Sequence, residues 1–450
     1  MNVAPFAGVT ACPLSAKAPA MRVAIVGAGY SGTIAAVEIA SAAPGASIVL
    51  IEKSGRFAQG AAYGTTSPGH LLNVRARNMS ALARDPDHFA GWAADEGYGS
   101  DDYVPRRDYR RYLAGLLDGA AGVERVTGAA VAVEDGAIAL ESGERFECEA
   151  AILAGGNFPS RLPAEFGPGA IHDPWGPQGA EALDRAAARG GELLLVGTGL
   201  TMVDMAVSLE EAGFAGRITA CSRRGLVPRA HVSPPAAALD WEPPARLGDM
   251  VRAVRARTPW RSSVDGLRPH SIALWQGLEE AEQRRFLRHL RPWWDVHRHR
   301  IAPAVAARIE AMRCSGRLEV AAGRIVRVEG EKVTIARRGG GELRRSFGAI
   351  INCTGPEGDI RRVGDPLIRG LLASGRARPD RLGLGLEVGR DSRVAGGGPS
   401  PALYAVGPLS RGAFWEIIAV PDIREQVAGV AKSVLRCAGS TGSPATQDER

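Results

Sequence analysis

The stretch Arg22-Val-Ala-Ile-Val-Gly27-Ala-Gly29-Tyr-Ser31-Gly32 lies near the start of the chain and decides its fold. Four apolar residues predict a buried parallel strand, and three glycines at G-x-G-x-x-G spacing lead directly into an alanine-rich helix. At this spacing Gly27 permits a tight turn, Gly29 lets the backbone approach a pyrophosphate, and Gly32 lets the helix pack closely. Phosphate oxygens would lie at the helix N-terminus, beside Ser31. The stretch therefore predicts an α/β fold that binds an adenine dinucleotide.

A second strand, Ser47-Ile-Val-Leu-Ile-Glu52-Lys53, strengthens this prediction. Glu52 lies 20 residues beyond Gly32. At that distance a carboxylate is placed to accept hydrogen bonds from a ribose hydroxyl. Glu52 and Lys53 are therefore candidate cofactor-binding residues. The alternative is an α/β turn without a ligand.

Composition and charge are those of an ordinary soluble globular protein. The chain has 450 residues, of which 45% are hydrophobic and 23% charged, and this length predicts two domains with insertions or three domain-sized units. The net charge of +6 is modest for this length. It fits anionic cofactors and an anionic substrate at least as well as nucleic acid.

The six cysteines are scattered singly, without a C-x-x-C pair. This distribution indicates a reducing compartment, which we expect to be the cytoplasm, and argues against a zinc site or a redox-active disulfide. No apolar run reaches the roughly 18 residues that would span a membrane. We expect residues 1–20 to be a disordered leader, with Met21 as a possible start, and residues 438–450 to be a disordered tail.

A polar, glycine-punctuated stretch follows Glu52 and has the character of a functional loop. Its basic and amide side chains crowd one short segment, 73–78, where cofactor or substrate contact is expected. The alternative is a surface loop. A helix with Pro105 at its entry follows. The candidates from this part of the chain are Tyr63, His70, Asn73, Arg75, Arg77, Asn78 and Arg107.

A second strand, glycine turn and helix occur at Leu195-Val-Gly197-Thr198-Gly199-Leu-Thr201-Met202. Met202 stands where a third glycine would be, so this motif is less specific than the first. The next strand ends in Ser222-Arg223-Arg224 rather than in an acid. Arginines there suit a 2′-phosphate, which favours NADPH over NADH. The alternative is a solvated basic turn.

The segment 236–309 is rich in Arg, Trp and Pro. Basic residues interleaved with aromatic ones can bind nucleic acid. We favour a helical insertion that packs its Trp and Leu side chains inside the fold, because the segment lies within a cofactor-binding framework. His297 and His299 are two residues apart and have no Cys or carboxylate cluster beside them, so we expect no metal site.

Several motifs together resemble one flavoprotein family. They are Gly60-Ala-Ala-Tyr63-Gly64-Thr65, His70-Leu-Leu-Asn73-Val, Leu195-Val-Gly-Thr-Gly-Leu-Thr201, Ser222-Arg-Arg-Gly225-Leu226, Ile351-Asn-Cys-Thr-Gly-Pro356 and Gly407-Pro-Leu-Ser-Arg411-Gly412. Over residues 21 to 435 the chain is similar to FAD and NAD(P)H monooxygenases, in particular the family that contains a bacterial FAD-dependent urate hydroxylase and the nitrosuccinate-forming aspartate N-hydroxylases.

The resemblance implies two Rossmann-like dinucleotide-binding domains, the second inserted into the first. The expected boundaries are 21–160 for the first part of the FAD domain, 161–315 for the NAD(P)H domain and 316–437 for the second part of the FAD domain. The segment Phe166-Gly167-Pro-Gly169-Ala-Ile-His172 is similar to the monooxygenase fingerprint F-x-G-x-x-x-H, with a proline in place of the middle glycine. The late cofactor candidates are Thr354, Gly355, Gly407 and Trp415.

The resemblance also implies that NADPH reduces FAD and that one oxygen atom of O2 is transferred to a small substrate. Arg75, Asn78 and Arg411 are the candidates to hold an anionic substrate, since arginine pairs with carboxylates in a bidentate way. His70 and His172 are candidates to move protons. We expect urate as substrate because the chain is compact, in a monomer or homodimer without nucleic-acid or membrane partners. An aspartate-type N-hydroxylase, a flavin reductase and a non-catalytic dinucleotide sensor are the alternatives.

Overall fold

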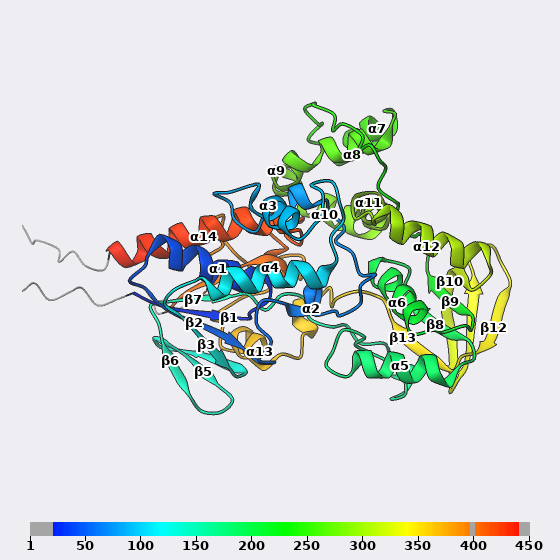
Figure 1. The fold of residues 1–450 in the computed structure, drawn as a ribbon, viewed down its shortest axis with the longest axis horizontal. Coiled ribbons are helices and arrows are strands. Elements are labelled where there is room, and N and C mark those ends of the chain that lie inside the picture. The colour runs from blue at the N-terminus through cyan, green and yellow to red at the C-terminus, as the bar shows by residue number, and fades with distance from the viewer. Residues whose placement is uncertain (1–20, 397–400, 441–450) are drawn as a thin grey trace, which may run out of the picture.

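Two sheets built around parallel strands, one in each of two domains, dominate the computed structural model (Figure 1), which describes residues 21–396 and 401–440. The expected leader 1–20 lies outside the described residues, as does 441–450 of the expected tail. The last helix continues to Ser440. Residues 438–440, which the sequence analysis placed in the tail, therefore belong to this helix.

The first sheet confirms the expected parallel core. Its strand order is β14-β7-β1-β2-β3, and all neighbouring strands run parallel. The strands are β1 (Arg22–Val26), β2 (Ser47–Glu52), β3 (Val123–Thr127), β7 (Ala150–Leu153) and β14 (Ala402–Ala405). The late return to this sheet is confirmed, because β14 pairs with β7 after the chain has passed through the second domain. The inner strands are apolar except at their ends, Arg22, Ser47 and Glu52, because both faces of the sheet are covered.

The two faces of the first sheet are covered differently (Figure 1). Helices α1 (Tyr30–Ala42), α4 (Arg106–Asp118) and α14 (Val420–Ser440) pack on one face. An antiparallel meander and α13 (Pro366–Ala373) pack on the other. Pro105 precedes α4 as expected, since its fixed φ suits a helix entry. The remaining elements of this domain are α2 (Gly60–Tyr63), α3 (His88–Asp95), β4 (Ala130–Glu134), β5 (Ala137–Leu140) and β6 (Arg145–Glu147).

The second sheet has the order β12-β11-β10-β9-β8-β13. Its strands are β8 (Leu193–Val196), β9 (Ile218–Ser222), β10 (Leu318–Glu329), β11 (Lys332–Arg337), β12 (Glu342–Ser346) and β13 (Ala349–Asn352), and its helices are α5 (Gly179–Arg189), α6 (Leu200–Glu211) and α12 (Pro303–Cys314). The expected boundary at 315/316 is therefore too early. The strands from 318 to 352 belong to the second sheet, because β10 pairs with β9 and β13 pairs with β8.

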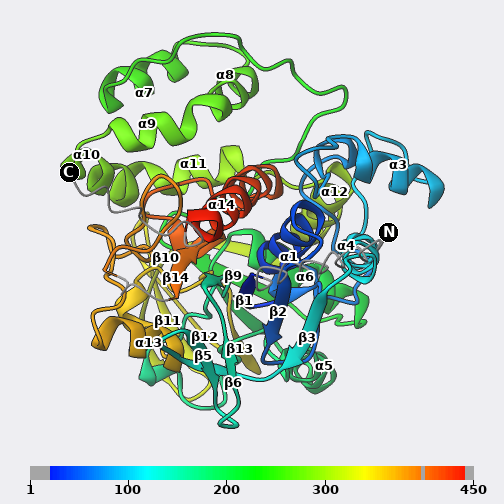
Figure 2. The ribbon, with the colours of Figure 1, turned by 90° about the vertical axis from the view of Figure 1, so that its left-hand side faces the viewer.

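Most of the expected insertion 236–309 forms helices that project away from both sheets (Figure 2), but its last residues, from Pro303 on, belong to α12 and pack in the core of the second domain. Its helices are α7 (Leu247–Arg255), α8 (Trp260–Gly266), α9 (Ser271–Gly277), α10 (Glu280–Arg285) and α11 (Arg291–Arg298), with a π-helical turn at Phe286–Leu290. Trp275 is buried and stacks on Trp415 of the first domain at a ring distance of 5.0 Å. Trp293, in contrast, is 45% exposed. The insertion thus starts from the second domain but is anchored on the first.

Within the described residues, no helix is long and apolar enough to cross a membrane. Neither do His, Cys, Asp and Glu side chains gather there in a group of three that could hold a metal ion.

Candidate dinucleotide and substrate cavity

A cavity of about 2240 Å³ lies between the two domains. Its wall includes Gly27 and Gly29 at the end of β1 and Gly197 and Gly199 at the end of β8. In parallel α/β sheets, ligands bind at the carboxyl ends of the strands. The two expected dinucleotide turns therefore open onto one continuous space.

The first glycine turn has the geometry that a pyrophosphate requires. Gly27 has a φ of +100°, and a Cβ there would lie 2.5 Å from the carbonyl oxygen of Ala154 on the neighbouring strand. A side chain is therefore excluded. At Gly29 the nearest neighbouring atom to such a Cβ is the Cα of Gly60, 3.6 Å away, which is ordinary van der Waals contact, and Gly29 lines the cavity. A Cβ on Gly32 would lie 1.8 Å from the oxygen of Gly27, which explains the close helix packing.

Glu52 lies on the cavity wall with its carboxylate already oriented. Its Oε2 accepts a hydrogen bond from the backbone N of Ala28 at 2.9 Å, and its Oε1 accepts from the N and Oγ of Ser54 at 3.0 and 2.8 Å. A carboxylate has about four acceptor positions, so capacity remains for ribose hydroxyls. The structure thus places a fixed acceptor where the sequence predicted one.

Most other candidates between residues 53 and 172 also line the cavity, on the short helices and loops that follow the strands of the first sheet. They are Lys53, Tyr63, His70, Asn73, Arg75, Arg77, Asn78 and His172. Ser31 and Gly32 lie behind the turn and are not part of this wall. Ser31 is buried, beside Gly407.

Besides Ser31 and Gly32, three further candidates lie outside the cavity wall. Arg107 is exposed on α4 and does not line the cavity, because successive residues of a helix point about 100° apart. Gly407 donates its N–H to Oε1 of Gln426 at 2.8 Å and packs against Ser31, outside the wall. Trp415 is buried against Trp275 in a core cluster and contributes no surface to the cavity.

The second glycine turn repeats the geometry of the first. Gly197 has a φ of +125°, and a Cβ there would lie 2.1 Å from the carbonyl oxygen of Cys353. A Cβ on Gly199 would meet nothing within 4 Å. Met202, at the position of the missing third glycine, is fully buried in the core of the second domain. Thr201, Thr354 and Gly355 line the adjoining wall.

A basic patch lies where the second sheet meets the cavity. Ser222 is hydrogen-bonded to Thr198, with 2.8 Å between the two hydroxyl oxygens, and this contact fixes the end of β9. Arg223 and Arg224 follow, and Arg324 of the neighbouring β10 lines the same wall. The sequence did not single out Arg324, since its position depends on strand pairing. These guanidinium groups fit the 2′-phosphate of NADPH.

The wall beyond the two turns is rich in arginine. Arg75 is 8% exposed, donates to the carbonyl of Val232 at 2.9 Å, and lies 3.3 Å from Asp101. The guanidinium of Arg411 lies 4.5 Å from the ring centre of Trp415. Burial, with Arg291 nearby, lowers the pKa of Arg411 to about 10. Arginines of the insertion were not predicted as site residues. Those that line the wall are Arg268, Arg291, Arg298 and Arg300.

His70 ties the two domains together. Its Nε2 lies 2.9 Å from the carbonyl oxygen of Asp204 and 3.0 Å from Oγ of Ser208, and its Nδ1 lies 2.7 Å from Oγ1 of Thr65. Arg106 adds a two-pronged ion pair to the Asp204 carboxylate at 2.9 and 3.1 Å. Burial lowers the pKa of His70, which keeps its ring neutral. His70 therefore joins the two domains through hydrogen bonds to residues of both.

His172 lies near the chain crossing between the domains. Its Nε2–H donates to the carbonyl of Gly167 at 3.3 Å, while its Nδ1 is buried without a hydrogen-bond partner in the described part of the chain. Nearby, Nδ2 of Asn352 donates to the carbonyls of Ser160 and His172 at 3.0 and 2.9 Å. These bonds hold the end of β13 against the connecting segment that contains Ser160 and His172.

Comparison with known proteins agrees with this geometry. Residues 24–158 match a family model described as FAD-NAD(P)-binding, whereas no curated protein matches the sequence. This match confirms the expectation that the chain binds FAD and NAD(P).

Solved structures share the fold at low sequence identity. An ornithine N-hydroxylase of Kutzneria sp. 744, solved with reduced FAD, NADP⁺ and L-ornithine, is 14% identical, with 93% of this chain and 100% of that chain covered and a TM-score of 0.67. The cadaverine monooxygenase of Erwinia amylovora, bound to FAD, is 9% identical, with 95% and 96% covered and a TM-score of 0.66. Thioredoxin reductase of Lactococcus lactis is 15% identical, with 93% and 99% covered and a TM-score of 0.51. The chain therefore has the fold of the two-dinucleotide flavoproteins, with an FAD-NAD(P)-binding domain over residues 24–158.

Proposed function

We propose that the protein is an FAD-dependent, NADPH-consuming monooxygenase that hydroxylates the nitrogen of a small amine bearing carboxylates, an acidic amino acid. The observation that carries this proposal is the single cavity that joins both glycine turns to an arginine-rich wall. Such a cavity brings two dinucleotides and an anionic third molecule into one space.

When bound, NADPH and FAD would supply the reducing equivalents for the reaction, and O2 would supply the oxygen atom. The protein's own part is to bind, orient and exclude water. Glu52 would hold the ribose of FAD, and Arg223, Arg224 and Arg324 would hold the 2′-phosphate of NADPH. Arg75, Asn78 and Arg411 face the substrate.

The charge of the wall supports an anionic substrate. Around the cavity opening formed by the loop 73–79, the helical insertion and the segment 411–420, only Asp265 and Asp295 are acidic among the described wall residues. The arginines of the same region are Arg75, Arg77, Arg268, Arg291, Arg298, Arg300 and Arg411. Guanidinium groups bind carboxylates in a planar, two-pronged geometry. Asp101, Glu416 and Asp422, which lie outside the wall, pair with Arg75, Arg298 and Arg268. The arginines still outnumber all of these acids, so an amino acid with a second carboxylate would match the remaining positive charge.

Two structural neighbours support nitrogen as the site of oxygen transfer, since they are named as an ornithine N-hydroxylase and a cadaverine monooxygenase. Urate, which the sequence analysis placed first, has no comparable support. We therefore place the aspartate-type N-hydroxylase ahead of the urate hydroxylase.

A disulfide reductase, the function of another neighbour with this fold, has less support. Among the described residues the cysteines Cys148, Cys221, Cys314 and Cys353 are free. Burial raises the pKa of both Cys148 and Cys221 to about 11, so these thiols are not thiolates at neutral pH. A reductase of that kind needs a dithiol or an external protein acceptor.

The proposal is tested by NADPH oxidation and peroxide release with FAD-loaded protein and a panel of L-aspartate, L-ornithine, cadaverine and urate. We expect L-aspartate to accelerate NADPH oxidation while peroxide release falls, because the oxygen atom then goes to the substrate. Stimulation by urate alone would overturn the amine assignment, and stimulation by none of the four would overturn the monooxygenase assignment for this class of substrate.

A further inference from the structure

We propose that His231 accepts the ammonium proton of the amine substrate, in a subsite where Arg75, Arg298 and Arg300 hold the substrate's carboxylate. This inference deepens the proposed function and rests on it. It assigns a catalytic role to a residue that no sequence motif singles out.

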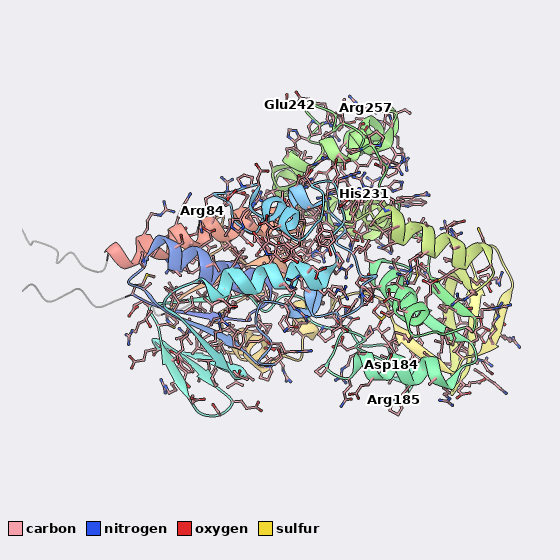
Figure 3. All side chains as sticks on the ribbon, viewed as in Figure 1. Arg84, Asp184, Arg185, His231, Glu242 and Arg257 are labelled. Carbon is pink, nitrogen blue, oxygen red and sulfur yellow. The ribbon has the colours of Figure 1, made fainter. Side chains whose placement is uncertain are left out.

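The backbone fixes His231 between the domains. It follows β9 and lies beside the insertion, where Figure 3 labels it. The N–H of His231 donates to the carbonyl of Ile301 at 3.0 Å, and the N–H of Arg229 donates to the carbonyl of Val296 at 2.9 Å. The segment is thus held to the end of α11 and the residues after it. The ring lines the cavity.

One hydrogen bond sets the tautomer of the ring. Nε2 of His231 lies 3.0 Å from the carbonyl oxygen of Asn73. A carbonyl only accepts, so Nε2 carries the proton and Nδ1 of the neutral ring keeps its lone pair. Nδ1 has no hydrogen-bond partner among residues 21–396 and 401–440. A neutral imidazole with a free Nδ1 on the cavity wall is a proton acceptor in position.

The surroundings of the ring are cationic. Arg75 comes from the loop of the first domain, and Arg298 and Arg300 come from the end of α11 and the residues after it. Burial and these arginines lower the pKa of His231 to about 4, so the ring is neutral at pH 7. The acids paired with these arginines are Asp101 with Arg75, Asp265 with Arg300, and the buried Glu416, whose Oε2 lies 3.0 Å from Nε of Arg298.

Tyr103 also faces the ring, with 5.3 Å between the ring centres. Its hydroxyl is buried and has no hydrogen-bond partner within the described residues. Burial raises the pKa of Tyr103, so it stays neutral and adds no charge beside His231. The pKa of His231 is therefore lowered first by burial and then by the arginines, whose contribution a bound anion can offset.

This arrangement makes the acceptor depend on the substrate. Without an anion, the three arginines oppose protonation of the ring. A bound carboxylate offsets their charge, which raises the pKa of His231 and lets Nδ1 take a proton from the adjacent ammonium. An amine without a carboxylate would leave His231 a weak base. The subsite would thus favour anionic amines twice: the arginines bind the carboxylate, and the bound carboxylate makes His231 a stronger base.

The proton balance of the reaction agrees with this role. The sum R–NH3⁺ + NADPH + O2 → R–NHOH + NADP⁺ + H2O conserves atoms and charge. Hydroxylation needs the lone pair of the free amine, so one proton must leave the ammonium, and one proton must join the hydride to form water. His231 receives that proton from nitrogen and releases it within the same turnover.

The first test follows the ring itself and does not require turnover. NMR of ¹⁵N-histidine-labelled, FAD-loaded protein is titrated with pH, with and without succinate, which carries two carboxylates and no amine. His231→Gln assigns the signal, because its amide can still donate to Asn73. We expect succinate to raise the pKa of His231 by about 1 to 3 pH units. An unchanged pKa at high succinate concentration overturns the inference.

The second test measures kcat/KM for L-aspartate against pH in wild type, His231→Gln and the control His289→Gln, an exposed histidine outside the cavity wall. We expect His231→Gln to lose about 10²-fold to 10⁴-fold at pH 7, with the deficit narrowing as pH rises and more substrate arrives as free amine. Retained FAD and an unchanged KM for NADPH would show that the fold is intact.

The outcomes of the kinetic test separate the two proposals. A wild-type protein that hydroxylates none of the amines overturns the proposed function. An active wild type whose His231→Gln variant keeps its kcat/KM and pH profile overturns the role of His231 and leaves the proposed function standing.

Discussion

The two glycine turns of this molecule share one backbone geometry and differ in the charge that faces the ligand. Gly27 and Gly197 both have positive φ, and a Cβ at either would meet a carbonyl oxygen of the neighbouring strand at 2.5 and 2.1 Å. The strand after the first turn ends in Glu52, whereas the strand after the second ends beside Arg223 and Arg224.

At these sites the backbone and the side chains therefore recognise different parts of a dinucleotide. The glycines make room for a pyrophosphate, which both cofactors carry. The side chain one strand away distinguishes a ribose hydroxyl, which a carboxylate recognises, from a 2′-phosphate, which arginines recognise.

The first prediction concerns the ion pair that links the domains carrying the two glycine turns. Asp204 lies on α6, just after the second turn, and its buried carboxylate pairs with Arg106 of the first domain. Asp204→Ala leaves a buried guanidinium unpaired, which we expect to cost about 3–5 kcal/mol of unfolding free energy. The apparent Tm should fall by about 10 °C. Glu181→Ala removes the exposed Arg185 pair and should change stability by less than about 1 kcal/mol. Equal effects would contradict the buried pair's importance.

The second prediction treats the turns as a matched pair. Gly27→Ala should weaken FAD binding about 100-fold, and Gly197→Ala should weaken NADPH binding by a similar factor, since each combines positive-φ strain with a clash. Gly45→Ala, where a Cβ meets nothing within 4 Å, is the control. Flavin absorbance of the purified protein and KM for NADPH are the measurements. Loss of FAD from Gly197→Ala would show that the two sites are not separate.

The third prediction concerns the acidic side of the comparison. Glu52→Gln keeps the shape but loses the charge that accepts from ribose, so FAD affinity should fall about 20-fold. Titration of apoprotein with FAD measures this change, and KM for NADPH should be unaltered. An unchanged FAD affinity would remove Glu52 from the site.

The fourth prediction concerns the basic side. The double variant Arg223→Gln, Arg224→Gln should raise KM for NADPH about 10-fold and leave KM for NADH unchanged, because only NADPH carries the 2′-phosphate. Arg185→Gln, an exposed arginine of α5 (Figure 3), is the control. A parallel rise in both KM values would refute recognition of the phosphate.

The sequence allowed prediction of what depends on short-range pattern. Each of these features depends on residues within about 30 positions in the sequence: the two glycine turns, the carboxylate at Glu52 and the helix entry at Pro105. The structure has each of them in place. The pairing of β13 with β8 joins residues far apart in the chain, and no local pattern distinguishes this strand from one of the first sheet. The domain boundary was therefore misplaced.

The candidates that lie outside the cavity wall, and the site residue that was not predicted, have similar physical reasons. Arg106 and Arg107 are adjacent in the sequence, and only the phase of α4 turns the first towards Asp204 and the second towards solvent. Trp415 follows a cofactor-like segment, yet it packs on Trp275 from an insertion whose docking no local rule predicts. His231 was missed because its neighbours Asn73 and Arg300 come together only in the folded chain.

The most direct test of the proposed function is the mass of the product formed from L-aspartate under ¹⁸O2, with FAD-loaded protein and NADPH. The account predicts a hydroxylamine of aspartate, or its further oxidation products, that carries oxygen-18 on nitrogen. Unchanged aspartate, with all reducing equivalents recovered as peroxide, would contradict it. So would oxygen-18 in a product of urate when urate is supplied in place of aspartate.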